Sequence, residues 1–159
     1  MRGVGTPRGG EGGGADSAKG APMRDVSHYT EIGTTTNTVT YTTDADPDIL
    51  MIVPREGTID TAADARENAA FFHAYASRLG RPCGCVVMMA TMLSQDADAR
   101  RAYSDISPAL FYGAALVVES ALSRALGSFF VGLSRPVVPT RLFDTAERAT
   151  EWLKSMRPG

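Results

Sequence analysis

Sulfur and imidazole side chains are common metal ligands and nucleophiles, and this chain of 159 residues has few of them. Its two cysteines, Cys83 and Cys85, and its two histidines, His28 and His73, lack the spacing of a zinc site. The cysteines lie in an apolar run predicted to be a strand, so they point to one face and are too close for a relaxed disulfide. We therefore predict buried structural thiols, no metal site, no cofactor and a reducing compartment, the cytoplasm.

Other catalytic patterns are also missing from the sequence. There is no Gly-x-Ser-x-Gly nucleophile elbow and no Gly-Lys-Ser/Thr phosphate loop. The carboxylate pairs Asp44/Asp46 and Asp96/Asp98 fall in predicted turns and caps, where aspartates usually have structural roles. A buried polar cluster at the carboxyl edge of the sheet would favour an enzyme, and the sequence does not indicate one. We therefore expect no catalytic residue and a protein that is not an enzyme.

Arginines gather around the later predicted loops and helices. They are Arg100, Arg101, Arg124, Arg135 and Arg141. They could form a contact for an anion or a partner protein, or they could simply be solvated. A formal net charge of −2 and the absence of interleaved basic and aromatic residues argue against nucleic acid as the partner.

The composition divides the chain into a tail and one domain. Residues 1–28 are rich in glycine and poor in large apolar side chains, which predicts a disordered tail; alternatively, Met23 is the translation start. Residues 29–156 are enough for one domain, and 157–159 form a short C-terminal tail. No apolar run is long enough to span a membrane.

Hydrophobic periodicity predicts an α/β fold over residues 29–156. A half-buried strand within 29–43 and an apolar strand at 49–53 form an antiparallel hairpin around a turn at 44–48. Parallel βα units then follow, with a helix capped by Asp60 or Thr61. The later elements are a helix at 62–79, a strand at 83–89, a loop at 90–96, a short helix at 96–103, a strand at 110–118, a helix at 120–133, a strand at 140–143 and a final helix capped by Asp144 or Thr145.

The predicted helix at 120–133 carries an unusually broad apolar stripe. Its members are Ala121, Leu122, Ala125, Leu126, Phe129, Phe130 and Leu133. At helical spacing, such a stripe is expected to pack on the sheet. The surplus residues Phe129, Phe130 and Val131 could instead contact a partner or lipid.

The chain resembles the SpoIIAA-like branch of the STAS domain superfamily. The similarity is carried by Gly57-Thr-Ile-Asp60, Asp98-Ala-Arg-Arg-Ala-Tyr103, Ala114-Ala-Leu-Val-Val-Glu119 and Arg124-Ala-Leu-Gly-Ser-Phe-Phe130. Its sharpest part is Arg135-Pro136 followed by Pro139-Thr-Arg-Leu-Phe143 and Trp152-Leu153. The resemblance implies a single STAS-like (SpoIIAA-like) α/β domain. It would have about five strands in a mixed sheet and about four helices, largely on one side.

The resemblance also implies a role. STAS relatives are usually non-enzymatic regulators or adaptors that bind other proteins, so we expect a protein partner and a role in bacterial signalling. In the anti-sigma-factor antagonists, a serine at the N-terminus of the helix after the third strand is phosphorylated. The nearest candidate here is Ser94, and Thr91 is second. The alternative is a module that binds a small ligand or lipid in an apolar groove near Phe111, Phe129 and Phe130.

Overall fold

The structure, a computed structural model, describes residues 27–159. Apart from Ser27 and His28, the predicted N-terminal tail therefore lies outside the described residues. The described elements are β1 (Thr30–Thr34), β2 (Thr38–Thr42), β3 (Ile49–Pro54), β4 (Thr58–Asp60), α1 (Ala62–Leu79), β5 (Cys83–Met88), η1 (Met89–Thr91), β6 (Met92–Gln95), α2 (Ala97–Ser104), β7 (Phe111–Val117), α3 (Ala121–Ser134), β8 (Thr140–Phe143) and α4 (Ala146–Met156).

The main sheet is mixed, as predicted, but it has six strands and not five. Its strand order is β1-β2-β3-β5-β7-β8. The β1–β2 and β2–β3 pairs are antiparallel, and the remaining pairs are parallel. The extra strand arises because residues 29–43 form two strands: the backbone N–H of Thr35 donates to the carbonyl of Thr38 at 2.9 Å and turns the chain back.

A second, two-stranded sheet corrects the prediction of a loop at 90–96. There β6 pairs with β4 in parallel, so the segment is partly a strand. The two sheets are tied together by Thr91, whose hydroxyl donates to the carbonyl of Pro54 at 2.6 Å. In the chain, β4 follows β3 and β6 follows β5, so this small sheet lies beyond the carboxyl ends of β3 and β5.

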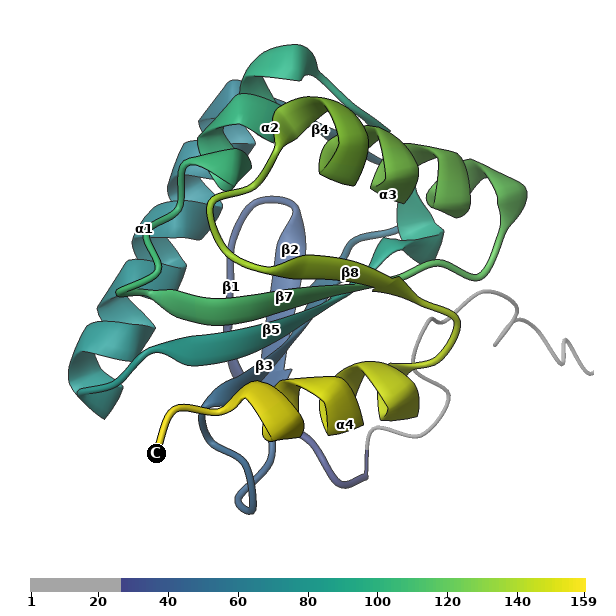
Figure 1. Ribbon diagram of the computed structural model, residues 1–159. Coiled ribbons are helices and arrows are strands. Elements are labelled where there is room, and N and C mark those ends of the chain that lie inside the picture. Colours follow the sequence, from purple (N-terminus) through teal and green to yellow (C-terminus); the bar gives the residue numbers. More distant parts are fainter. Residues whose placement is uncertain (1–26) are drawn as a thin grey trace, which may run out of the picture.

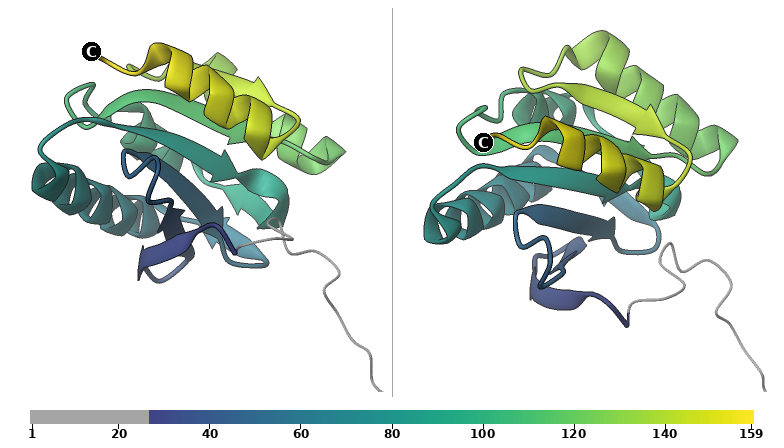
Figure 2. Two further views of the ribbon diagram at one scale, coloured as in Figure 1. Left: turned by 90° about the horizontal axis from the view of Figure 1, so that it is seen from below. Right: turned by 60° about the horizontal axis from the view of Figure 1, so that its bottom comes forward.

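Helices cover both faces of the main sheet. On one face, α1 contributes Phe72 and Ala76 to a core with β3, β5 and β7, and α3 contributes Phe130 to a neighbouring cluster. On the opposite face, α4 packs through Ala149 and Leu153. Figure 1 shows α1, α2 and α3 on one side of the sheet and α4 on the other, and both views in Figure 2 bring α4 forward. Within residues 27–159, no helix is both long and apolar enough to cross a membrane.

Local capping explains where three helices begin. Thr61 and Asp64 form a reciprocal capping box at α1, and Thr145 caps α4. Ser120 and Ser123 form a second reciprocal capping box at α3. Gly80 ends α1 in the left-handed conformation, with φ of 75°, which glycine adopts without strain.

The orientation of α3 differs from the prediction that its apolar stripe packs on the sheet. The buried residues of α3 are Ser123, Gly127 and Phe130. In contrast, Leu122, Phe129 and Leu133 are exposed. The physical reason is close approach: a Cβ on Gly127 would lie 2.8 Å from Leu142 Cδ2 and 3.1 Å from Val118 Cγ1. Small residues therefore face the sheet, and most of the predicted stripe faces solvent.

Candidate functional site

A buried cluster of polar side chains lies between the small sheet, α1 and α2. Its centre is Asp60 at the end of β4, whose side chain is 1% exposed. Oδ1 of Asp60 accepts hydrogen bonds from Asn37 Nδ2 at 2.9 Å and Tyr103 Oη at 3.2 Å. Oδ2 accepts one from Gln95 Nε2 at 3.1 Å. Three separate segments therefore converge on one carboxylate at the end of a fourth.

Asn68 of α1 completes the cluster. Its Nδ2 donates to Tyr103 Oη at 2.8 Å and to Asn37 Oδ1 at 3.0 Å, while its Oδ1 accepts from the Thr35 hydroxyl. Asn68 is buried in the same helical row as Phe72, four positions later. The polar groups thus satisfy one another, as buried polar groups must.

The charge of Asp60 has no basic partner nearby. No lysine, arginine or histidine of the described residues 27–159 forms an ion pair with it. Burial raises the pKa of its carboxyl, and the hydrogen bonds from Gln95, Asn37 and Tyr103 only partly oppose that shift. Burial, followed by the charge of Asp60, also raises the pKa of Tyr103.

The cluster forms one wall of a cavity between the sheet and the three helices on that face. The cavity has a volume of about 90 Å³. Asp60, Asn37, Asn68, Gln95 and Tyr103 contribute its polar side. Its apolar lining includes Ile52, Phe72, Val87, Phe111, Leu116 and Phe130. The arrangement can hold a small, mostly apolar molecule beside a carboxylate.

The three phenylalanines of the predicted apolar groove do not lie on one surface. Phe111 and Phe130 are buried and line the cavity. Phe129 is 52% exposed on the outside of α3, where the Arg100 guanidinium lies 5.4 Å from the centre of its ring. The three residues therefore belong to two different surfaces, one internal and one external.

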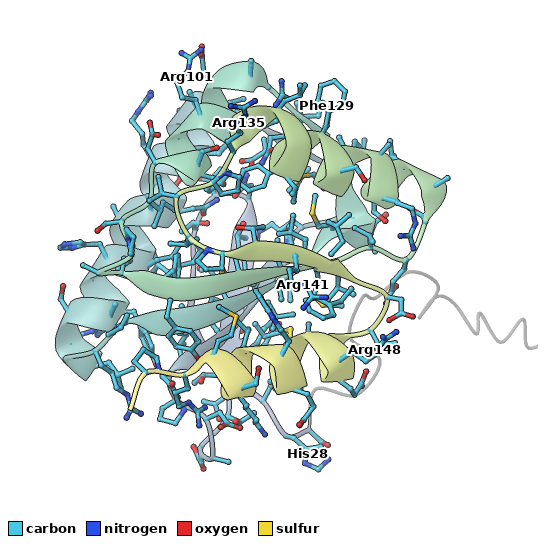
Figure 3. The ribbon with its side chains drawn as sticks, viewed as in Figure 1. His28, Arg101, Phe129, Arg135, Arg141 and Arg148 are labelled. Atoms are coloured by element: carbon cyan, nitrogen blue, oxygen red, sulfur yellow. The ribbon has the colours of Figure 1, made fainter. Side chains whose placement is uncertain are left out.

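The five predicted arginines do not form a single patch. Figure 3 shows Arg101 and Arg135 near Phe129 at one end of the molecule, and Arg141 apart from them. Arg141 lies over the rings of Phe143 and Trp152, at 5.6 Å and 5.7 Å from their centres, on the α4 side of the sheet. Arg100 contacts Phe129, and Arg124 is exposed on α3. The arginines that remain near α2 and α3 are Arg100, Arg101, Arg124 and Arg135.

The two candidate phosphoacceptors have different surroundings. Ser94 is exposed in β6, two residues before Asp96, which caps α2. Thr91 is 5% exposed, and its hydroxyl donates a hydrogen bond to the carbonyl of Pro54. A kinase needs an accessible hydroxyl, so of the two only Ser94 has a suitable position.

The cysteines lie in β5 as free, buried thiols. Burial raises the pKa of Cys83 to about 11 and that of Cys85 to about 12, which suppresses the reactive thiolate. Among residues 27–159, no group of three or more His, Cys, Asp and Glu side chains is arranged to hold a metal ion.

Sequence reasoning missed the Asp60 cluster. It treated Asp60 only as a helix cap, although Thr61 has that role. One signal was available: Asn68 is a polar residue within the otherwise apolar row Ala65, Phe72 and Ala76. The contribution of Gln95 and Tyr103 had no comparable signal, because Gln95 meets Asp60 through the pairing of β4 with β6 and Tyr103 through the packing of α2 on α1.

The described residues have a SpoIIAA-like α/β fold. A solved structure described as an uncharacterized protein from the DUF3478 family with a SpoIIAA-like fold, from Shewanella loihica PV-4, matches it with a TM-score of 0.52. The two chains are 13% identical, and the match covers 76% of this chain and 99% of the other. Residues 44–157 match the family model DUF7793, a domain of unknown function, and the chain belongs to that family. Comparison with curated proteins gave no match.

Proposed function

We propose that this STAS-like module is a non-enzymatic regulator or adaptor that binds another protein through the outer face of α3. The supporting observation is the apolar stripe of Leu122, Phe129 and Leu133, which are 49%, 52% and 66% exposed. They recur at intervals of seven and four residues, so they lie on one side of the helix. A solvent-facing stripe of this kind supports the proposal of an interaction surface on this side of α3.

Neighbouring elements extend this surface. The α3 helix packs beside β6, and a shallow hollow between them is lined by Gln95, Arg100 and Phe129. On the small sheet, Ile59 and Leu93 are 63% and 53% exposed. We define the α3 surface as Leu122, Phe129 and Leu133 together with Ile59 and Leu93.

The charges near the α3 surface favour an acidic partner. The Arg100 guanidinium of α2 lies over the exposed Phe129 ring, at 5.4 Å from its centre, whereas helical spacing puts Arg124 on the side of α3 opposite the stripe. A helix with an apolar stripe can pack along α3 by interdigitation of side chains. The partner we propose is therefore an amphipathic helix of another protein, with acidic residues beside its apolar stripe.

The Asp60 cluster is a buried polar cluster of the kind that would favour an enzyme, but the bonds and neighbours of Asp60 support non-enzymatic action. Its carboxylate is buried, and its two oxygens already accept three hydrogen bonds from neutral side chains. Beside this carboxylate the cluster supplies amide groups, the Tyr103 phenol and the Thr35 hydroxyl, and it adds no serine, cysteine or lysine nucleophile.

We further propose that phosphorylation of Ser94 regulates partner binding. Ser94 is exposed on β6, beside α3. A phosphate there would add close to two negative charges next to a surface that attracts an acidic helix. We expect Ser94→Glu to weaken partner binding several-fold, while Ser94→Ala leaves it unchanged.

The test compares capture of partners by the full chain and by Phe129→Asp. A specific partner should be retained by the wild type and lost by Phe129→Asp, and an acidic amphipathic segment from it should bind the purified protein. The matched control is His73→Asp, which places the same charge on an exposed position of α1.

Three results would contradict this proposal. One is equal retention of every partner by wild type and Phe129→Asp. The others are self-association through α3, measured by light scattering, and binding to lipid vesicles that Phe129→Asp abolishes.

A second candidate function is binding of a small ligand. The cavity of about 90 Å³ between the sheet and α1–α3 favours it, because most of its lining is apolar while one wall carries polar groups. This candidate uses Phe111 and Phe130, whereas the protein-binding proposal uses Phe129. The two functions can therefore be tested by different substitutions.

A further inference from the structure

The carboxylate of Asp60 has unused capacity to accept a hydrogen bond. An ionised carboxylate can accept about four hydrogen bonds. Oδ1 accepts two, from Asn37 and Tyr103, and Oδ2 accepts one, from Gln95. Asp60 borders the cavity, so a bound molecule could donate to the remaining position on Oδ2.

The same carboxylate lacks a counter-charge. Its donors are two amides and a phenol, and none of them carries a positive charge. Within residues 27–159, no ion pair neutralises it. A buried carboxylate without a cation is expensive in free energy, so a cationic ligand would be favoured at this position over a neutral or anionic one.

The remaining lining limits the size and character of the ligand. Apart from the polar wall, the cavity is bounded by side chains such as Phe72, Val87, Phe111 and Phe130. An apolar protein cavity of roughly 150 Å³ accommodates benzene. This cavity, at about 90 Å³, therefore suits a shorter, thinner apolar body.

We propose that the cavity binds a small alkylammonium ligand, whose ammonium group donates to Oδ2 of Asp60 and whose short hydrocarbon chain contacts the apolar lining. This inference rests on the second candidate function and specifies its ligand class. The ammonium supplies both the missing donor and the missing positive charge. A carboxylate or phosphate ligand of the same size would be repelled by Asp60.

The test uses three probes of matched length with the full chain. They are n-butylammonium, 1-butanol and butyrate, with binding measured by calorimetry and by saturation-transfer NMR. We expect n-butylammonium to bind at least tenfold more tightly than 1-butanol, and butyrate not to bind. Asp60→Asn should remove the preference for ammonium over alcohol. Asp105→Asn, at an exposed position after α2, is the matched control.

A pH titration of the wild type keeps the proposal testable even if Asp60→Asn does not fold. The titratable groups near Asp60 are Tyr103 of α2 and Asp64 of α1. Burial raises the pKa of Tyr103, which therefore stays protonated, so n-butylammonium binding should strengthen as the pH rises through the raised pKa of Asp60 and its carboxyl ionises. Binding of 1-butanol should not change in parallel.

The outcomes separate this inference from the function on which it rests. If none of the three probes binds, the cavity holds only water and the ligand-binding function itself fails. If 1-butanol binds as tightly as n-butylammonium, ligand binding stands and the ammonium preference is wrong. An affinity for n-butylammonium that is independent of pH would also contradict the proposed contact between the ammonium group and Asp60.

Discussion

Arg157 reaches back across the molecule to Asp48: its Nε donates to Asp48 Oδ2 at 2.8 Å, over a sequence separation of 109 residues. Its Nη2 also donates to Asp46 Oδ1 at 2.7 Å. The residue after α4 is thereby joined to the turn that precedes β3. Asp48 is buried, with 3% of its side chain exposed.

Removal of this arginine should destabilise the fold. In Arg157→Ala, Asp48 would keep only Arg81, whose Nη2 is 3.7 Å away and whose side chain is 54% exposed. We expect the free energy of unfolding to fall by about 2 kcal/mol, since a buried acceptor loses its partner. Urea denaturation of the full chain measures the change.

The control for Arg157→Ala is Arg148→Ala. Arg148 pairs with Asp144 at 3.0 Å, but both side chains are largely exposed. Exposed ion pairs contribute little, so this substitution should cost less than about 0.5 kcal/mol. Equal losses for the two variants would show that the link from Arg157 to Asp48 has no special structural role.

Asp60 should make the protein relatively more stable in acid. Burial raises the pKa of its carboxyl in the folded state, so protonation is easier there than in the unfolded chain. Its contribution is therefore fully present below the unfolded pKa and is lost as the pH rises through the folded pKa. We expect Asp60→Asn to be most destabilising, relative to wild type, at about pH 4 and less so at about pH 7.5. Chemical denaturation at several pH values measures this difference. A larger loss of stability at about pH 7.5 than at about pH 4 would contradict the prediction.

Asp46 should show the opposite pH dependence. Burial alone would raise the pKa of Asp46, but hydrogen bonds from Arg157 and Lys154 lower it overall. Its contribution is present above the unfolded pKa and is lost as the pH falls through the lowered folded value. Asp46→Asn should therefore be less stable than wild type at neutral pH, with the difference closing in acid. Asp44→Asn, at an exposed position of the same turn, is the matched control.

Two glycines of α3 should respond oppositely to the same substitution. A Cβ at Gly132 meets no atom within 4 Å, so Gly132→Ala should raise the free energy of unfolding by about 0.5–1 kcal/mol through helix propensity. A Cβ at Gly127 would press on Leu142 and Val118, so Gly127→Ala should lower it by about 1 kcal/mol. Thermal unfolding distinguishes the two, and equal gains would mean that α3 does not approach the sheet as closely as described.

Elements with strong local signals were predicted well from the sequence. The predicted strand at 140–143 matches β8, and the predicted helix at 62–79 matches α1. Caps and stops at Thr61, Gly80 and Thr145 act through neighbouring backbone groups, so they can be recognised without knowledge of the fold.

Elements that exist only through distant pairing were not predicted. Strand β4 has three residues, too few for a hydrophobic period, and its partner β6 lies more than thirty positions later. Their pairing brings Gln95 to Asp60, and the packing of α2 on α1 brings Tyr103 to Asn68. The sequence therefore did not predict the Asp60 cluster, because its residues lie far apart in the chain and meet only in the folded protein.

The sequence by itself determined the four helices, the order of the main-sheet strands from β3 onward, several caps and the presence of an apolar stripe on α3, because these depend on residues a few positions apart. Only the tertiary structure decided which side of α3 faces the sheet. Close packing favours the smallest side chains at the tightest contact, so Ser123 and Gly127 turn inward, and Phe129 and Leu133 remain in solvent. Likewise, only the folded chain surrounds Asp60 with neutral donors and a cavity, because those groups come from segments that meet solely in three dimensions.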